Sequence, residues 1–434
     1  MVYQQRRLTL LNQVKPDSVV LFAANQIVYR NNDANFPFRQ HSDFWYLSGF
    51  QEPDAWLLLS NKHGKQESVM FCLPNDKLAE IWHGRRLGVD NAVAELAVDA
   101  AHDVANLQEK LVDYLDGAEH VYFSLGENKA NDECVMSVLE VLRSAPKQSK
   151  LAPTSLCDPR PLLHEMRLIK DEHELSLMRK AAQISVQGHQ RAMRFSRPGI
   201  YEYQLEAEIH HEFLMSGARS PAYGSIVGAG DNACILHYTE NSDIIQDNAL
   251  VLIDAGAEYQ GYAGDITRTF PANGQFTPEQ KQIYQLVLDA QLAALEWYRP
   301  GFTLQQASDK AIEVITDGLI ELGILSGTRE ENIQVNAHRE YYMHGLGHYL
   351  GMDVHDVGDY KKDGQDRAFA AGMVLTIEPG IYIAPDADVD PKWHGIGVRI
   401  EDNVLITSDG YEVLTAELVK EPDAIEQFMQ GSTQ

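Results

Sequence analysis

The sequence predicts an α/β protein of two domains, the second of which is α+β and contains an internal repeat. Three observations predict it. Short apolar runs alternate with helical stretches in the first part, prolines interrupt this pattern near Pro153, and one order of helices and strands occurs twice in the second part. The 434 residues also exceed the ~100–200 residues of one ordinary domain. We therefore expect domains at residues 1–160 and 161–434.

The first domain is expected to be an α/β layer. The apolar runs Ser18–Ala24, Ala55–Ser60 and Val69–Leu73 are bounded by Pro, Asp or Asn, which is typical of buried strands. Helical stretches such as Asn106–Leu115 lie between such runs. Three prolines then interrupt the pattern, and a strongly charged helix is expected to open at Lys170.

The second domain contains two copies of one order of elements. Each copy starts with a helix that ends in Arg-Pro-Gly, at Arg197 and again at Arg299, and a second helix follows. The helix that ends at Arg299 is expected to begin at Pro278. Two strand-like segments that carry acids come after each helix pair. These segments are Leu250–Gly256 and Gly261–Asp265 in the first copy, and Val374–Gly380 and Gly395–Glu401 in the second. Two related halves would place Asp254 opposite Glu378 and Asp265 opposite Glu401 across a pseudo-two-fold axis.

Four carboxylates gathered at one point predict a bound cation. Each acid ends a leucine-rich or β-branched run or lies in a glycine-spaced strand, where an unpaired carboxylate loses several kcal/mol of hydration. Any one of them alone would more often be a helix cap or an ion-pair partner. Like charges at equivalent positions of a repeat instead require a cation or protonation.

A nitrogen ligand is expected from the histidine-rich segment Met343–Gly358. His344, His348 and His355 lie in it, and the glycines at 345 and 347 favour a loop over a helix. Carboxylates with one imidazole form a hard ligand set that suits Mn²⁺, Co²⁺ or Fe²⁺. Bridging carboxylates can hold two such ions ~3.5–4 Å apart with a hydroxide between them.

Charge and cysteine content exclude several classes of partner. The formal charge of −27, from 63 acidic and 36 basic residues, would repel nucleic acid and anionic membranes. No apolar run approaches the ~18 residues of a membrane span, and the N-terminus is a poor secretory signal. Four cysteines without a CxxC pair favour reduced thiols. We therefore expect a cytoplasmic protein.

One glycine motif resembles a dinucleotide-binding loop but does not predict one. Gly228–Ala233 has the GxGxxA spacing of a dinucleotide-binding loop, but the following Cys234–Tyr238 is expected to form a strand where that loop needs a helix.

Over essentially its whole length the chain resembles the aminopeptidase P and prolidase family, whose pita-bread catalytic fold is shared with methionine aminopeptidase. The N-terminal part, with Phe38–Asp54 and Glu80–Arg86, is similar to the creatinase/prolidase-like first domain of bacterial aminopeptidase P. The specific motifs are Ile253-Asp254-Ala-Gly with Asp265, His344-Gly-Leu-Gly-His348, Asp353-Val-His355-Asp-Val-Gly, Thr376-Ile-Glu378-Pro-Gly and Gly397-Val-Arg399-Ile-Glu401-Asp.

The resemblance implies a metalloaminopeptidase that removes an N-terminal residue preceding proline with two divalent ions, Mn²⁺ in this family. It implies that Asp265 and Glu401 bridge the ions, that Asp254 chelates one, and that His348 and Glu378 hold the other. Glu378 is also the expected general base or acid on a metal-bridging hydroxide. The substrate site would be lined by His237 and His355, as catalytic groups, and by His344, Tyr223 and Arg399. Trp82 would reach the site of a neighbouring subunit in a homo-oligomer, a dimer or a tetramer.

Three alternatives remain at this point. A prolidase would act on Xaa-Pro dipeptides, whereas the aminopeptidase would act on Xaa-Pro-Yaa peptides. A binding protein that has kept the fold, or a metal-free creatinase-like hydrolase, would have lost metal ligands. None of the five ligand positions departs from the motif.

Overall fold

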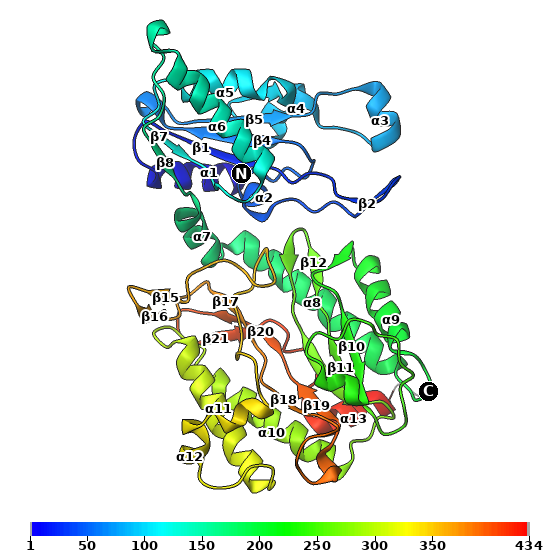
Figure 1. Cartoon of the computed structure of the whole chain (residues 1–434). Coiled ribbons are helices and arrows are strands. Elements are labelled where there is room, and N and C mark those ends of the chain that lie inside the picture. Colours follow the sequence, from blue (N-terminus) through cyan, green and yellow to red (C-terminus); the bar gives the residue numbers. More distant parts are fainter. Residues whose placement is uncertain (1, 432–434) are drawn as a thin grey trace. The chain divides into compact units, whose positions relative to one another are not determined.

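The computed structural model of the chain describes residues 2–431, which form two compact units that divide between Arg167 and Leu168 (Figure 1). Each unit has its own hydrophobic core. Within the described residues, no helix is both long enough and apolar enough to cross a membrane.

Unit 1 is built on a six-stranded mixed sheet with the strand order β6-β5-β4-β1-β7-β8. The central β1 pairs antiparallel with β4 and parallel with β7. The three strands predicted in this region are confirmed as β1, β4 and β5. The sheet strands are β1 (Ser18–Ala23), β4 (Trp56–Ser60), β5 (Glu67–Cys72), β6 (Ala100–Asp103), β7 (His120–Tyr122) and β8 (Ser155–Cys157), and a separate hairpin joins β2 (Tyr29–Asn31) and β3 (Ala34–Asn35).

Helices cover the sheet of unit 1. Apolar residues spaced at helical intervals, such as Leu107, Leu111 and Leu115, pack on strand residues Val19, Leu58 and Val121 in one core cluster. The helices are α1 (Val2–Gln13), α2 (Ser42–Ser48), α3 (Lys77–His83), α4 (Gly88–Leu96), α5 (Leu107–Leu115), α6 (Lys129–Ser144) and α7 (Arg160–Leu168).

Unit 2 contains two helix pairs. The expected charged helix begins at Glu172, where Asp171 and Glu174 form a capping box, and the predicted helix at Pro278 begins there behind a Thr277 capping box. In Figure 1 the first pair lies along one side of unit 2 and the second pair along the other. The helices are α8 (Glu172–Phe195), α9 (Glu202–Met215), α10 (Pro278–Leu295), α11 (Leu304–Glu321), α12 (Arg329–Gln334) and α13 (Pro422–Gln430).

Unit 2 also contains short antiparallel sheets. Their orders are β10-β11-β14, β13-β12-β9, β17-β20-β21, β18-β19 and β15-β16. The strands are β9 (Ser220–Pro221), β10 (Ile226–Ala229), β11 (Leu250–Asp254), β12 (Ala257–Tyr259), β13 (Tyr262–Ala263), β14 (Thr267–Pro271), β15 (Lys361–Lys362), β16 (Gln365–Asp366), β17 (Val374–Ile377), β18 (Gly380–Ile383), β19 (Ile396–Arg399), β20 (Asp402–Ile406) and β21 (Tyr411–Val413).

The predicted internal repeat is confirmed. The helix pair α8 and α9 precedes the antiparallel pair β11 and β14, and the helix pair α10 and α11 precedes the antiparallel pair β17 and β20. The two halves bond to each other where these strands meet. The backbone N–H of Glu401 donates to the carbonyl of Thr267 at 3.0 Å, and the Asn403 side chain accepts from the backbone N–H of Asp265 at 3.1 Å.

A fully buried arginine, Arg268, donates hydrogen bonds at this junction. The Arg268 guanidinium donates to the carbonyls of Glu401 at 2.6 Å and Leu418 at 3.1 Å, and to the Asp402 carboxylate at 2.7 Å. Burial opposes the charge on Asp402, but Arg268 and Lys420 outweigh it and hold the pKa of that carboxyl well below its ordinary value. Losing the guanidinium would leave these buried acceptors without their donor.

We therefore expect Arg268→Met, which keeps an unbranched side chain, to lower the free energy of unfolding by about 3–5 kcal/mol, the usual cost of breaking a buried ion pair. Urea denaturation followed by circular dichroism measures this change. The matched control is Arg329→Met, because Arg329 forms a half-exposed ion pair with Asp317 on the same unit. It should change the free energy of unfolding far less, because solvent screens an exposed ion pair. Equal losses in the two variants would contradict the structural role of Arg268.

Candidate metal centre

The four carboxylates lie at equivalent places in the two halves. Asp254 is the last residue of β11, and Glu378 directly follows β17. Asp265 lies just before β14, and Glu401 lies between β19 and β20. The fifth residue, His348, comes from the loop before β17, which is irregular as the glycine spacing predicted.

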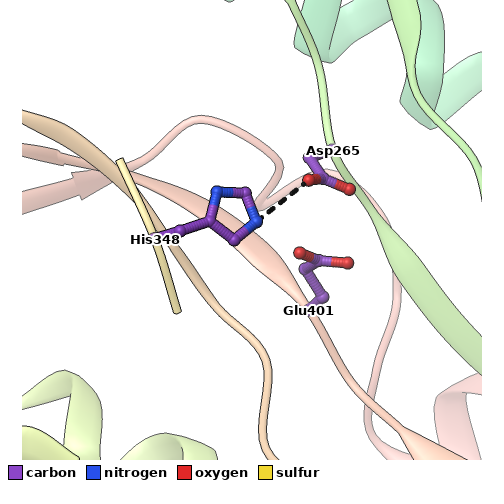
Figure 2. A group of neighbouring side chains, drawn as sticks. All are labelled: Asp265, His348 and Glu401. Atoms are coloured by element: carbon purple, nitrogen blue, oxygen red, sulfur yellow. Dashed lines mark ion pairs between the residues drawn. The ribbon is translucent and has the colours of Figure 1, made fainter. Parts of the chain in front are cut away.

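Three of the five predicted ligands lie together, with Nε2 of the imidazole directed at the carboxylates (Figure 2). One ligand atom from each of Asp265, His348 and Glu401 falls within 4.8 Å of the others. His348 Nε2 is 3.4 Å from Asp265 Oδ2 and 3.5 Å from Glu378 Oε1, so Glu378 borders the same cluster. The other ring nitrogen, Nδ1, donates to the Tyr349 carbonyl at 3.0 Å. That is the usual arrangement of a metal-binding histidine.

Asp254 joins the group through two other side chains. The Tyr223 hydroxyl lies 2.6 Å from Asp254 Oδ1 and 2.5 Å from Asp265 Oδ1. Arg399 Nη2 donates to Asp254 Oδ2 at 2.6 Å. Because the phenol has one hydrogen, it can donate to only one of the two carboxylates at a time. Burial and the nearby Asp254 and Asp265 charges also raise the pKa of the Tyr223 phenol well above its ordinary value.

Burial and crowding disfavour ionised carboxylates at this site. Burial, followed by the Asp265 and Glu378 charges, raises the pKa of Glu401 well above its ordinary value. Burial also raises the pKa of Asp265, with a further contribution from Asp254, and raises that of Glu378 to about 7. Burial lowers the pKa of His348, but the Asp265 and Glu378 carboxylates outweigh it and raise it to about 9. The group therefore has an excess of acid that a cation would relieve.

A chain of hydrogen bonds runs from the cluster to His344. Arg399 Nη1 donates to the Tyr382 hydroxyl at 2.8 Å, and that hydroxyl lies 2.8 Å from His344 Nε2. His344 Nδ1 lies 2.8 Å from the carbonyl of residue 345, which can only accept. Nδ1 therefore carries the hydrogen, and Tyr382 donates to Nε2. Burial, together with Arg399, lowers the pKa of His344 to about 4, so this imidazole is neutral near pH 7.

The other predicted site residues lie at the surface. The His355 ring lies 4.0 Å from the His348 ring, between centroids. His237 is also exposed. Trp82 is on α3 of unit 1 and is 76% exposed.

The strand predicted at Cys234–Tyr238 was wrong. The chain forms a 3₁₀ turn at Gly230–Cys234, and the Ile235 N–H then bonds back to the Asn232 carbonyl. This turn packs closely on β19, where a Cβ at residue 397 would meet the Ala233 carbonyl at 2.4 Å. The contact joins segments far apart in the chain, so the local sequence pattern does not predict it.

Sequence reasoning missed four polar residues of this site. Three lie two positions from a predicted ligand and therefore share its side of the chain. Thr267 donates to Glu401 Oε2 at 2.7 Å, Thr376 donates to Glu378 Oε1 at 3.3 Å, and Asn403 bonds the backbone of Asp265. The period-two spacing from each acid was the signal that could have found them. The fourth, Tyr382, shows no such local signal.

The donor set fits divalent cations. It offers carboxylate oxygens and one imidazole nitrogen, and no cysteine of the described residues belongs to the described cluster. The Arg399 guanidinium forms an ion pair with Asp254 at 2.6 Å. One guanidinium and one imidazole do not balance four carboxylates, and hard divalent ions match that need.

Known proteins are similar to this chain over both units. A model of metallopeptidase family M24 matches residues 176–408, and one of the aminopeptidase P N-terminal domain matches residues 3–122. The Xaa-Pro aminopeptidases of Escherichia coli and Haemophilus influenzae are 49% and 46% identical over 98% of this chain, and 97% and 96% of their own lengths are covered.

Solved structures agree with these matches. A proline aminopeptidase P II from Yersinia pestis is 50% identical with a TM-score of 0.97, over 99% of both chains. A zinc-substituted Escherichia coli aminopeptidase P in complex with product is 48% identical with a TM-score of 0.98, over 100% of this chain and 98% of that one. The matched family model covers more than half of the sequence, and the relatives cover nearly all of it. The chain therefore belongs to metallopeptidase family M24.

Proposed function

We propose that this chain, an Xaa-Pro aminopeptidase of family M24, hydrolyses the bond between an N-terminal residue and a following proline at the cluster around Asp265, His348 and Glu401. The observation that carries this mechanism is the group of buried carboxylates with one imidazole at the junction of the two halves. The relatives named Xaa-Pro aminopeptidase, nearly full in length, support the activity.

The proposed ligands of two cations, Mn²⁺ in the cell, are Asp254, Asp265, His348, Glu378 and Glu401. Asp265 and Glu401 would bridge, because they belong to opposite halves and approach each other through the Thr267 and Asn403 bonds. When bound, two such ions supply a hydroxide at neutral pH and polarise the scissile carbonyl.

Glu378 is the proposed proton carrier. Burial raises its pKa to about 7, the region in which a carboxylate can both take and return a proton at neutral pH. Thr376 donates to its Oε1, and His344 Nδ1 lies 3.9 Å from its Oε2. These contacts hold the carboxyl in one orientation.

The remaining polar groups are proposed to orient the substrate. Arg399 and Tyr223 fix Asp254, and neutral His344 lies beside the cluster where the proline ring and the next residue would fit. His237 and His355 would steady the tetrahedral intermediate or move protons. The X-Pro bond is a tertiary amide without an N–H, so recognition has to come from the ring and the free α-amine.

We also propose the wider setting. Residues 1–160 and 161–434 would be the N-terminal and catalytic domains of a cytoplasmic homo-oligomer, a dimer or a tetramer. Its partners would be peptides with proline at the second position. Nucleic acid and anionic membranes would not be partners, because the net charge of −27 repels both. Exposed Trp82, with its exposed neighbours Leu78 and Ile81, supports a contact with another subunit.

Metal removal tests the centre. We expect complete chelation to abolish cleavage of an Xaa-Pro-Yaa peptide, and two equivalents of Mn²⁺ to restore it and raise the melting temperature, because the cations relieve the carboxylate repulsion. Activity, metal content and thermal unfolding are measured on one sample. Turnover that survives complete metal loss would rule out the proposed centre.

The variant Glu378→Gln tests the proton carrier. We expect kcat to fall by at least ~10²-fold, the scale of general acid–base catalysis, since the amide keeps the shape but cannot take a proton. Metal content must be measured alongside, because Glu378 is also a proposed ligand. Glu321→Gln, at the exposed end of α11, is the matched control and should keep normal kcat. Near-normal turnover with both ions bound would assign proton transfer to another group.

Peptide length separates the aminopeptidase from a prolidase. We expect kcat/KM for Xaa-Pro-Yaa to exceed that for Xaa-Pro by at least about tenfold, because the dipeptide brings a free carboxylate into an acidic site. Steady-state kinetics on a matched peptide pair measures the ratio, with Xaa-Ala-Yaa as the control for the proline ring. A preference for the dipeptide would favour the prolidase.

A further inference from the structure

The first helix of each half carries one fully buried polar side chain at the same place in the repeat. These residues are His189 on α8 and Gln291 on α10, both 0% exposed. Each lies eight residues before the arginine of its Arg-Pro-Gly segment, 189 before 197 and 291 before 299. The repeat therefore relates these two side chains to each other, as it relates the acids.

In the second half, Gln291 holds the backbone just before both acids. Its Nε2 donates to the carbonyls of Ile377 at 3.2 Å and Ile400 at 3.1 Å, which precede Glu378 and Glu401. Its Oε1 accepts from Lys420 Nζ at 2.9 Å. Because an ammonium group can only donate, this contact fixes the amide with its NH₂ toward the two carbonyls.

In the first half, His189 holds the backbone just after both acids. Its Nε2 donates to the Ala255 carbonyl at 2.9 Å. The Ala255 N–H in turn donates to the Ile266 carbonyl at 3.0 Å. Ala255 follows Asp254, and Ile266 follows Asp265. The imidazole therefore bonds the backbone beside Asp254 directly, and that backbone in turn bonds Ile266 beside Asp265.

Packing alone does not account for His189. Its Nδ1 is buried and has no hydrogen-bond partner, which is unfavourable relative to an apolar group of similar size. A leucine would fill the same space against the α8 core without that cost. What leucine lacks is the N–H that faces the Ala255 carbonyl.

We propose that His189 and Gln291 are a repeat-related pair of positioning residues, each of which ties together the backbone beside the two carboxylates of its half and so aims that pair at the cations. The proposal rests on the proposed metal site. It assigns the two residues no contact with substrate. Groups that orient metal ligands from behind usually change metal affinity by 10–100-fold when they are lost.

The test uses the full chain loaded with Co²⁺, whose visible spectrum reports ligand geometry. Affinity is measured by competition with a chelator, and kcat and KM are measured with Mn²⁺. We expect His189→Leu and Gln291→Met to weaken Co²⁺ binding by about tenfold and to change the spectrum. His189→Gln, which places the residue of the second half in the first, restores a donor and should recover most of the affinity and the spectrum.

The matched control is Met193→Ala, which removes a buried apolar side chain from the same helix one turn further on. It should lower stability without moving the Co²⁺ spectrum. If Met193→Ala weakens metal binding as much as His189→Leu, or if His189→Gln recovers nothing, the positioning role is overturned. An Asp265→Ala variant that keeps the wild-type Co²⁺ spectrum would instead overturn the metal site itself.

Discussion

The repulsion among buried carboxylates at the junction of the two halves is the constraint on which unit 2 depends. Asp265 and Glu401 are almost fully buried. Burial, together with the charges of neighbouring carboxylates, raises the pKa of both. Folding has to hold these groups together in spite of that cost. The reciprocal bonds of Thr267 and Asn403, and the buried Arg268, provide the positive and polar contacts that keep the junction closed.

The internal repeat explains why the free-energy cost of burying like-charged carboxylates arises at one place. Each half contributes an acid at the end of one strand and another before the next strand, so the symmetry gathers four of them. The symmetry is then broken by single residues. Tyr223 comes only from the first half, and His348 only from the second. The two sides of the cluster therefore carry different side chains.

Much of the fold followed from local pattern. The two Arg-Pro-Gly segments and the apolar strands ending in acids are local signals, and the elements they predicted formed. The strand prediction at Cys234–Tyr238 failed because a short apolar run does not determine its own secondary structure. Packing of the preceding turn against β19 determines the conformation there. Thr267, Thr376 and Asn403 were readable from period-two spacing, whereas Tyr382 belongs to the site through its tertiary bonds to Arg399 and His344.

The sequence by itself determined which residue types are concentrated in the repeat, and so the presence of a hard, acidic cluster and the family to which its motifs belong. Only the tertiary structure decided how these residues meet: that Tyr223 lies between Asp254 and Asp265, that His344 is neutral, and that His189 and Gln291 stand behind the acids. The physical reason is that chemical type is a property of each residue. Separation, burial and hydrogen-bond direction instead depend on segments far apart in the chain, and these quantities set charge and orientation at the site.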